Sequence, residues 1–171
     1  MINARSSDLV IALTDPRGPA ALHLVAQLSA DIVVLYGDLG DDGSGNFRPE
    51  DAAGPGSGFL IATLDGRPVG CGAFRPWEPG IAEVKRMYVE PDVRGQGIAR
   101  RLLAELERLA QEAGYSAIRL ETGDRQPAAI RVYETSGYIR IPNYGNYSHH
   151  PNSLCYEKSL LESAQRLGGP F

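Results

Sequence analysis

Two glycines stand immediately before a predicted helix in the segment Arg94-Gly95-Gln96-Gly97-Ile98-Ala99. Glycines in this place let consecutive backbone N–H groups turn toward one point, and these donors together with the helix dipole favour a phosphate or pyrophosphate. Arg94 and Arg100 could add charge-assisted hydrogen bonds. The segment therefore predicts an anion-binding site, although a tight turn flanked by solvated arginines would use the same residues.

Two familiar phosphate-binding motifs do not match this segment. A dinucleotide fold requires a third Gly or Ala where Arg100 stands, and a shorter turn between strand and helix than Glu90 to Gly97. A P-loop requires Gly-Lys-Ser or Gly-Lys-Thr, which the segment lacks. The segment must therefore belong to another type of phosphate-binding turn that places glycines before a helix.

The elements around this segment are the ones that must position it. Residues 98–113 form an amphipathic helix pattern, which Gly114 ends. A strand is predicted at 81–89 before the segment, and another at 117–121 after the helix. This strand–helix–strand unit predicts a right-handed parallel crossover.

The remaining chain predicts an α+β domain. Apolar spacing indicates one helix or a broken pair over 19–36, and Asp65-Gly66 is a strong two-residue hairpin signal between two apolar runs. Turn-rich residues 37–58 predict a long flexible loop, and Pro127 opens a further helix that ends near Ser136. The strands expected besides 81–89 and 117–121 are 9–13, 59–64, 68–74, 138–141 and 154–158.

Composition limits the class of protein. With 171 residues, the chain is expected to be a single domain, 1–171, with a C-terminal tail at 160–171. Hydrophobic residues make up 43%, which is too many for a disordered chain. The net charge of −4 without a block of Lys or Arg argues against a nucleic-acid binder.

The two cysteines and the N-terminal residues indicate the cellular compartment. Cys71 and Cys155 lie far apart and outside any metal-binding pattern, so buried reduced thiols are favoured over a disulfide. No apolar h-region follows Met1, and no apolar run approaches the roughly 18 residues that span a bilayer. We therefore expect a cytoplasmic protein without membrane attachment. His149-His150 lacks partners at ligand spacing, so no metal is expected.

The glycine segment resembles the R/Q-x-x-G-x-G/A signature of the GNAT superfamily of acyl-CoA-dependent N-acyltransferases. Residues 83–89 look like the family's fourth strand, and the helix through Ala113 looks like its third helix. Residues 126–138 look like its later N-x-x-A-x-x-L-Y-x-x-x-G-F motif. Together these matches cover roughly residues 59–158 in the right order.

The resemblance implies a fold and a co-substrate. It implies a three-layer domain with helices on both faces of a mixed, mostly antiparallel sheet of about six to seven strands, with a parallel splayed pair at 81–89 and 117–121. It implies acetyl-CoA as co-substrate. The backbone of Met87, Tyr88 and Val89 would contact the pantetheine arm, and residues 94–100 would hold the pyrophosphate. Gln126 and Ala129 would also line the cofactor site, with Gln126 at a position where the family commonly has Asn.

The resemblance also implies two catalytic residues. Tyr133 falls where the family places its general acid, a phenol that can return a proton to the leaving thiolate. Glu83 lies six residues before Val89, where the histone-modifying branch carries its base. Strand alternation would place Glu83, Lys85, Met87 and Val89 on one face. A core role for Tyr133 and a solvated or Lys85-paired role for Glu83 are the competing interpretations.

The acceptor is expected to be an amine of a small molecule or a peptide. The acidic 37–58 loop could attract a cationic amine, but a solvated loop explains the same residues. A longer acyl group, and a CoA-binding sensor or interaction module without catalysis, are the alternative functions. Apolar residues Tyr138, Ile139 and Ile141 on a late strand would permit a homodimer.

Overall fold

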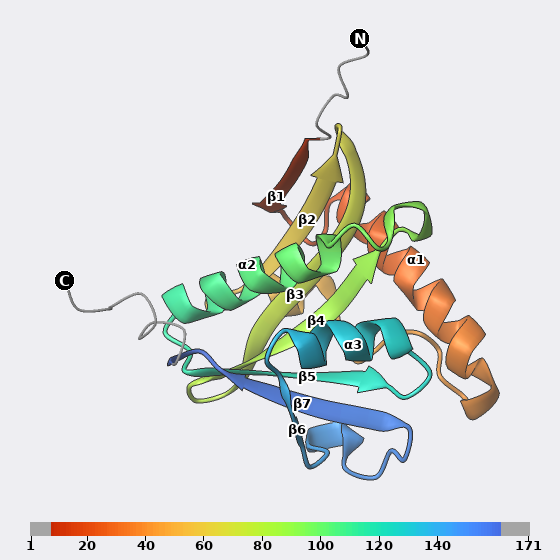
Figure 1. Ribbon diagram of the computed structural model, residues 1–171, viewed down its shortest axis with the longest axis vertical. Coiled ribbons are helices and arrows are strands. Elements are labelled where there is room, and N and C mark those ends of the chain that lie inside the picture. The colour runs from red at the N-terminus through yellow and green to blue at the C-terminus, as the bar shows by residue number, and fades with distance from the viewer. Residues whose placement is uncertain (1–7, 162–171) are drawn as a thin grey trace.

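The computed structural model describes residues 8–161, which form a seven-stranded sheet with helices on both faces (Figure 1). The strands are β1 (Leu9–Leu13), β2 (Gly58–Leu64), β3 (Arg67–Glu78), β4 (Ile81–Val89), β5 (Ala117–Gly123), β6 (Ile139–Ile141) and β7 (Ser153–Ser159). The helices are α1 (Pro19–Tyr36), α2 (Ile98–Glu112) and α3 (Pro127–Thr135). Short 3-10 turns occupy Gly37–Leu39, Pro49–Ala52, Pro91–Val93 and Gly145–Tyr147. The α+β class and the expected mixed sheet are confirmed; most of the predicted tail at 160–171 lies outside the described residues.

The strand order is β1-β2-β3-β4-β5-β7-β6. Within residues 8–161, β4 and β5 form the one parallel pair, and α2 supplies the crossover between them. The β2–β3 hairpin turns at Asp65 and Gly66, whose φ angles of 49° and 84° are both left-handed, as a two-residue turn of this kind requires. The predicted parallel pairing across α2 and the predicted hairpin turn are therefore confirmed.

The two faces of the sheet carry separate apolar cores. On one face, α2 buries Ile98, Leu102, Leu103, Leu106 and Ala110 against sheet residues that include Leu60 and Val84. Tyr133 of α3 joins this core. On the other face, α1 buries Ala21, Leu24 and Leu28 against residues that include Phe59, Ile61 and Cys71. Alternate residues of β2 thus serve opposite cores, as strand geometry dictates.

α1 is one unbroken helix rather than a broken pair. Residues Pro19–Leu39 are long and apolar enough to cross a membrane by length and composition, so the expectation that no run approaches this length is wrong. In the fold, however, one face of α1 lies on the sheet while Val33 and Val34 are exposed. A helix that packs one face on a sheet can satisfy the same criterion of length and apolar composition.

Segment 37–58, expected as a long flexible loop, lies against the sheet and α1. Ser29 Oγ donates a hydrogen bond to the Gly43 carbonyl (2.8 Å), and Arg75 Nη1 donates one to the Asn46 carbonyl (3.0 Å). Ala52 is buried in the α1 core. The segment therefore forms one wall beside β3 and β4.

The late-strand surface differs from its prediction at one residue. Tyr138 is buried, with its ring 6.0 Å from that of Tyr133, because it precedes β6 and turns into the α2 core. Ile139 is exposed, as expected, and Ile141 is partly buried. Tyr138 therefore contributes nothing to an outer apolar surface.

Candidate functional site

The site lies where β4 and β5 separate. The parallel ladder pairs Ile81 with Ala117, Ala82 with Ile118 and Glu83 with Arg119, and no pairing follows Glu83 within the described part of either strand. The predicted splay is therefore confirmed. Two cavities meet at this fork, and both are lined by Leu28, Ile32, Met87, Gln126 and Tyr133.

The larger cavity is a groove of about 680 Å³ that runs from the fork to the start of α2. The backbone segment expected to bind a pantetheine arm, Met87 to Val89, lies along it. At its far end lie the predicted phosphate-binding residues Arg94, Gly95, Gly97, Ile98, Ala99 and Arg100, while Gln126 and Ala129 form the α3 side. Gln96 is exposed and does not line the groove.

The turn before α2 leaves its N–H donors open. Gly95 and Gly97 have left-handed φ angles of 81° and 80°. A Cβ added to either residue would have no heavy atom of the described residues within 4 Å of it. Gly97 caps α2 without a side-chain hydrogen bond, and the first turn has no acidic residue. The free N–H groups and the positive end of the helix dipole therefore face an open space that suits an anion.

Arginines surround the groove, including two that the motif did not indicate. Arg94 Nε donates to the Val89 carbonyl (2.8 Å) and Arg94 Nη2 pairs with Asp31 (3.1 Å), so this guanidinium ties the turn to β4 and α1. Arg100 hydrogen-bonds to Thr135 on α3. Arg125 and Arg131 also line the groove. Arg131 stands four residues after Pro127, and this helical spacing is the signal that could have identified it.

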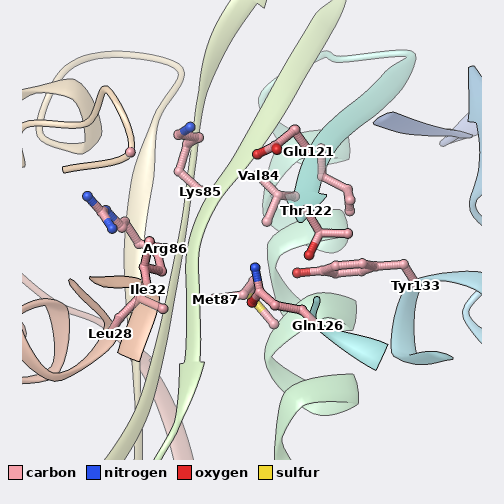
Figure 2. A pocket seen from close by; sticks show the side chains of 12 residues that line it. Leu28, Ile32, Val84, Lys85, Arg86, Met87, Glu121, Thr122, Gln126 and Tyr133 are labelled. Carbon is pink, nitrogen blue, oxygen red and sulfur yellow. The ribbon is translucent and has the colours of Figure 1, made fainter. Parts of the chain in front are cut away.

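Tyr133 lies at the junction of the two cavities. The residue is 6% exposed, and Figure 2 shows its hydroxyl pointing toward the Thr122 and Gln126 side chains. Burial raises its pKa, with the nearby Glu121 carboxylate acting in the same direction. The hydroxyl is protonated at neutral pH, as it would also be at the ordinary tyrosine pKa of 10, and the raised pKa makes it a weaker acid in the unliganded protein.

Glu83 is placed differently from the sequence expectation. It is 1% exposed and lines neither cavity. Arg75 contacts its Oε1 through Nε (3.1 Å) and Nη2 (3.0 Å), and the Tyr144 hydroxyl donates to its Oε2 (2.8 Å). Arg75 also pairs with Asp51 (3.0 Å). These contacts make Glu83 the centre of a network that fixes the 37–58 segment to β3 and β4.

A β-bulge divides β4 into two registers. Ala73 pairs with Lys85 and Cys71 with Tyr88, so that Arg86 and Met87 lie opposite the single residue Gly72. Arg86 has a left-handed φ of 58°. Ala82 and Val84 face the α2 core before the bulge, and Met87 and Val89 face it afterwards. The expected common face of Glu83, Lys85, Met87 and Val89 is therefore wrong, since the extra residue reverses the alternation.

The smaller cavity, of about 100 Å³, brings charged residues to the fork: Lys85 and Arg86 from β4, and Glu121 from β5. Lys85 Nζ donates a hydrogen bond to the Tyr147 hydroxyl (2.7 Å). Burial lowers the pKa of Lys85 and raises that of Glu121. Glu121 was absent from the sequence prediction, and it belongs to the partly exposed half of β5, in which every second residue is buried.

Acidic residues of the 37–58 segment already have partners. Asp38 pairs with Arg125 (2.7 Å), and Asp41 and Asp42 accept the backbone N–H groups of Gly43 and Ser44. The structure therefore gives these carboxylates local structural roles. It does not place them as a lining of either cavity.

Cys71 and Cys155 are both buried free thiols, as expected. Burial raises the pKa of Cys71 to about 12. Among residues 8–161, no three His, Cys, Asp or Glu side chains converge in a way that could hold a metal ion.

Comparison with known proteins gives consistent results. The profile of the Acetyltransferase (GNAT) family matches residues 31–138. The IAA acetyltransferase of Azospirillum brasilense is 38% identical over 155 residues, which cover 90% of this chain and 99% of that protein. A Klebsiella pneumoniae crystal structure, described as an acyl-CoA N-acyltransferase, has 33% identity and a TM-score of 0.74 over 89% of this chain and 97% of its own. The PaiA N-acetyltransferase of Thermoplasma acidophilum, solved with coenzyme A, shares the fold at 16% identity and a TM-score of 0.69, covering 89% of this chain and 99% of its own.

Proposed function

Because the chain belongs to the Acetyltransferase (GNAT) family, we propose that it transfers an acetyl group from acetyl-CoA to a primary amine bound at the β4–β5 fork. One observation carries this proposal. The groove that ends at the α2 N-terminus and the smaller polar cavity share Tyr133 in their linings, together with Met87 and Gln126. Two substrates bound from the two sides would therefore meet beside a phenol, in a direct transfer within a ternary complex.

The groove fits the chemistry of acetyl-CoA. Its far end offers free N–H donors at Gly95 and Gly97 together with several arginines, which suits a pyrophosphate in an acidic chain. Beyond Glu83, β4 has no β5 partner among the described residues, so the edge near Met87 is open to the amides of an extended arm. The coenzyme A complex of the PaiA relative supports this assignment.

We assign the proton donor to Tyr133. The amine nitrogen forms a bond to the acetyl carbonyl carbon, and the carbon–sulfur bond breaks. Tyr133 gives its proton to the departing thiolate and regains a proton from the amine nitrogen or from water.

We assign proton acceptance to Glu121. An amine arrives as an ammonium ion and must lose a proton before it attacks. Glu121 lines the smaller cavity, whereas both carboxylate oxygens of Glu83 are already engaged by Arg75 and Tyr144. These contacts favour a positioning role for Glu83, which supports the wall of the cavity.

The smaller cavity, of about 100 Å³, must hold the amine end of the acceptor, so it leaves little room for an acyl group longer than acetyl to extend into it from the groove. The acetyltransferase name of the Azospirillum relative supports the same choice. A sensor that binds acyl-CoA without catalysis would not need Glu121 and Tyr133 at one junction.

The proposal is tested with the purified 171-residue chain. Acetyl-CoA should raise the melting temperature through mass action, and release of free CoA should require an added amine. Mass spectrometry should detect an N-acetylated product. Stabilisation by acetyl-CoA without any amine-dependent product would instead support the sensor.

A further inference from the structure

We propose that the acceptor carries a carboxylate close to its amine, as a free amino acid does, and that Arg86 and Lys85 bind this carboxylate. The inference rests on the proposed function, because it names the substrate class of the same site. It is carried by one buried cation, Arg86, and one partly buried cation, Lys85, on the wall of the smaller cavity; neither forms an ion pair with a carboxylate among residues 8–161.

The stronger of the two observations concerns the surroundings of Arg86. Its side chain is buried, with the residue 7% exposed, and its Nε is buried without a hydrogen-bond partner. Nη2 donates to the Gly43 carbonyl (3.0 Å), and the guanidinium lies 5.9 Å from the centre of the Phe47 ring. In the described part of the chain, no carboxylate lies within 4.0 Å of it. A buried guanidinium without an anion is costly, and a bound carboxylate would offset that cost.

Lys85 is the neighbouring cation. Its Nζ donates to the Tyr147 hydroxyl (2.7 Å), and no carboxylate among the described residues lies within 4.0 Å. An ammonium group has three donors, so it can bind a ligand oxygen while it keeps this hydrogen bond. Lys85 and Arg86 are adjacent in the chain, and the bulge at Arg86 lets both line one cavity.

Among residues 8–161, the carboxylates near the fork form no direct ion pair with Lys85 or Arg86, and act on them only at longer range: Glu83 and Glu121 on Lys85, Asp41 and Asp42 on Arg86. Glu121 is the one carboxylate of the described residues that lines the cavity, and the proposed function assigns it to the amine of the acceptor. Glu83 and Asp51 share Arg75. Asp41 and Asp42 lie in the adjoining turn and accept backbone N–H groups. A purely cationic amine would therefore add like charge beside Lys85 and Arg86, whereas an amine with a carboxylate would complement them.

The arrangement orients such an acceptor. Figure 2 shows Lys85 and Arg86 on one side of β4, and Thr122, Gln126 and Tyr133 on the other. Because all of these residues line one cavity, an acceptor whose carboxylate is held by the two cations would have to extend across β4 for its amine to reach Glu121 and Tyr133. The volume of about 100 Å³ restricts the enclosed part of the acceptor to a small group.

The test compares the standard L-amino acids with their carboxamides, which keep the amine and remove the charge. Binding to the CoA-saturated protein is measured by calorimetry, and acetylation by release of CoA. We expect at least one amino acid to bind more than about tenfold more tightly than its carboxamide, with a matching difference in kcat/KM. Arg86→Gln should remove most of this preference, whereas Arg108→Gln, on the outer face of α2, should keep it.

The two readouts separate the two proposals. Equal or tighter binding of every carboxamide would overturn the carboxylate inference, whether or not turnover occurs. Selective binding of an amino acid without any acetylated product would support the carboxylate site and count against the transferase. Retained acetyl-CoA binding in Arg86→Gln shows that the variant is folded. An unchanged preference in that folded variant would also overturn the inference.

Discussion

The Tyr144 hydroxyl donates a hydrogen bond to Glu83 Oε2 across 2.8 Å, while Arg75 holds Oε1 of the same carboxylate. Tyr144 belongs to the segment after β6, and Arg75 to β3. The relationship therefore joins two distant parts of the chain to the strand that borders the fork. It gives Glu83 a supporting role and leaves Glu121 as the carboxylate of the cavity.

Glu83→Gln should therefore mainly reduce stability. The amide keeps the shape but leaves the partly buried Arg75 with Asp51 as its remaining anion. We expect a loss of roughly 1–3 kcal/mol in the free energy of unfolding, measured by urea denaturation. At temperatures where the variant is folded, kcat should fall less than in Glu121→Gln. A larger kcat loss in Glu83→Gln would restore Glu83 as the base.

The acetylation rate should fall on the acidic side because of Glu121. Burial raises the pKa of this carboxyl above its ordinary 4.5, so protonation removes the base at a higher pH than for an exposed glutamate. Glu121→Gln should lower kcat/KM about 10²- to 10⁴-fold and abolish this limb of the pH profile. If the acidic limb of the pH profile persists in the variant, a group other than Glu121 causes it.

The same raised pKa bears on stability. The folded state holds the Glu121 proton more tightly than the unfolded chain, so the stabilisation present at low pH is lost as pH rises through the folded pKa. Glu121→Gln should therefore be more stable than the parent at pH 8 and lose that advantage near pH 4. Thermal melts of the variant and the parent at pH 4 and pH 8 measure this difference in stability. The same difference at both pH values would contradict the prediction.

Gly97→Ala should weaken acetyl-CoA binding beyond its effect on folding. Gly97 and Gly114 both have left-handed φ angles, 80° and 93°. A Cβ added to either residue would have no heavy atom of the described residues within 4 Å of it. Each alanine should cost about 1 kcal/mol of stability. Only Gly97 faces the groove, so its variant should lose more than about tenfold in acetyl-CoA affinity by calorimetry. Equal affinities in the two variants would exclude the turn as a phosphate site.

Gly123→Ala should loosen the contact between α1 and the end of β5. A Cβ there would lie 2.1 Å from the Tyr36 hydroxyl, which accepts the Arg125 backbone N–H at 2.7 Å. We expect a loss of about 1–3 kcal/mol in unfolding free energy. Gly54→Ala is the control, because a Cβ at Gly54 meets no described heavy atom within 4 Å and Gly54 is absent from the left-handed residues of the described chain. Similar stabilities for the two variants would show that α1 shifts freely.

Local patterns predicted the α2 helix, the Asp65-Gly66 turn and the glycine turn, because each depends on residues close in the chain. The bulge at Arg86 was not predictable in this way, since one extra residue in β4 is visible only against its pairing with β3. Glu83 illustrates the consequence. Its partners Arg75, Asp51 and Tyr144 come from separate segments, so its burial depends on tertiary packing that spacing does not encode.

The most direct test of the account compares Tyr133→Phe with Tyr138→Phe in a single-turnover acetylation assay. Both variants remove one phenol oxygen from a buried residue, but of the two only Tyr133 lines the cavities. With a responsive amine and saturating acetyl-CoA, Tyr133→Phe should lower the rate about 10²- to 10⁴-fold without loss of acetyl-CoA binding, and Tyr138→Phe should leave it within a few-fold of the parent. A Tyr133→Phe rate equal to that of Tyr138→Phe would contradict acetyl transfer driven by the Tyr133 proton.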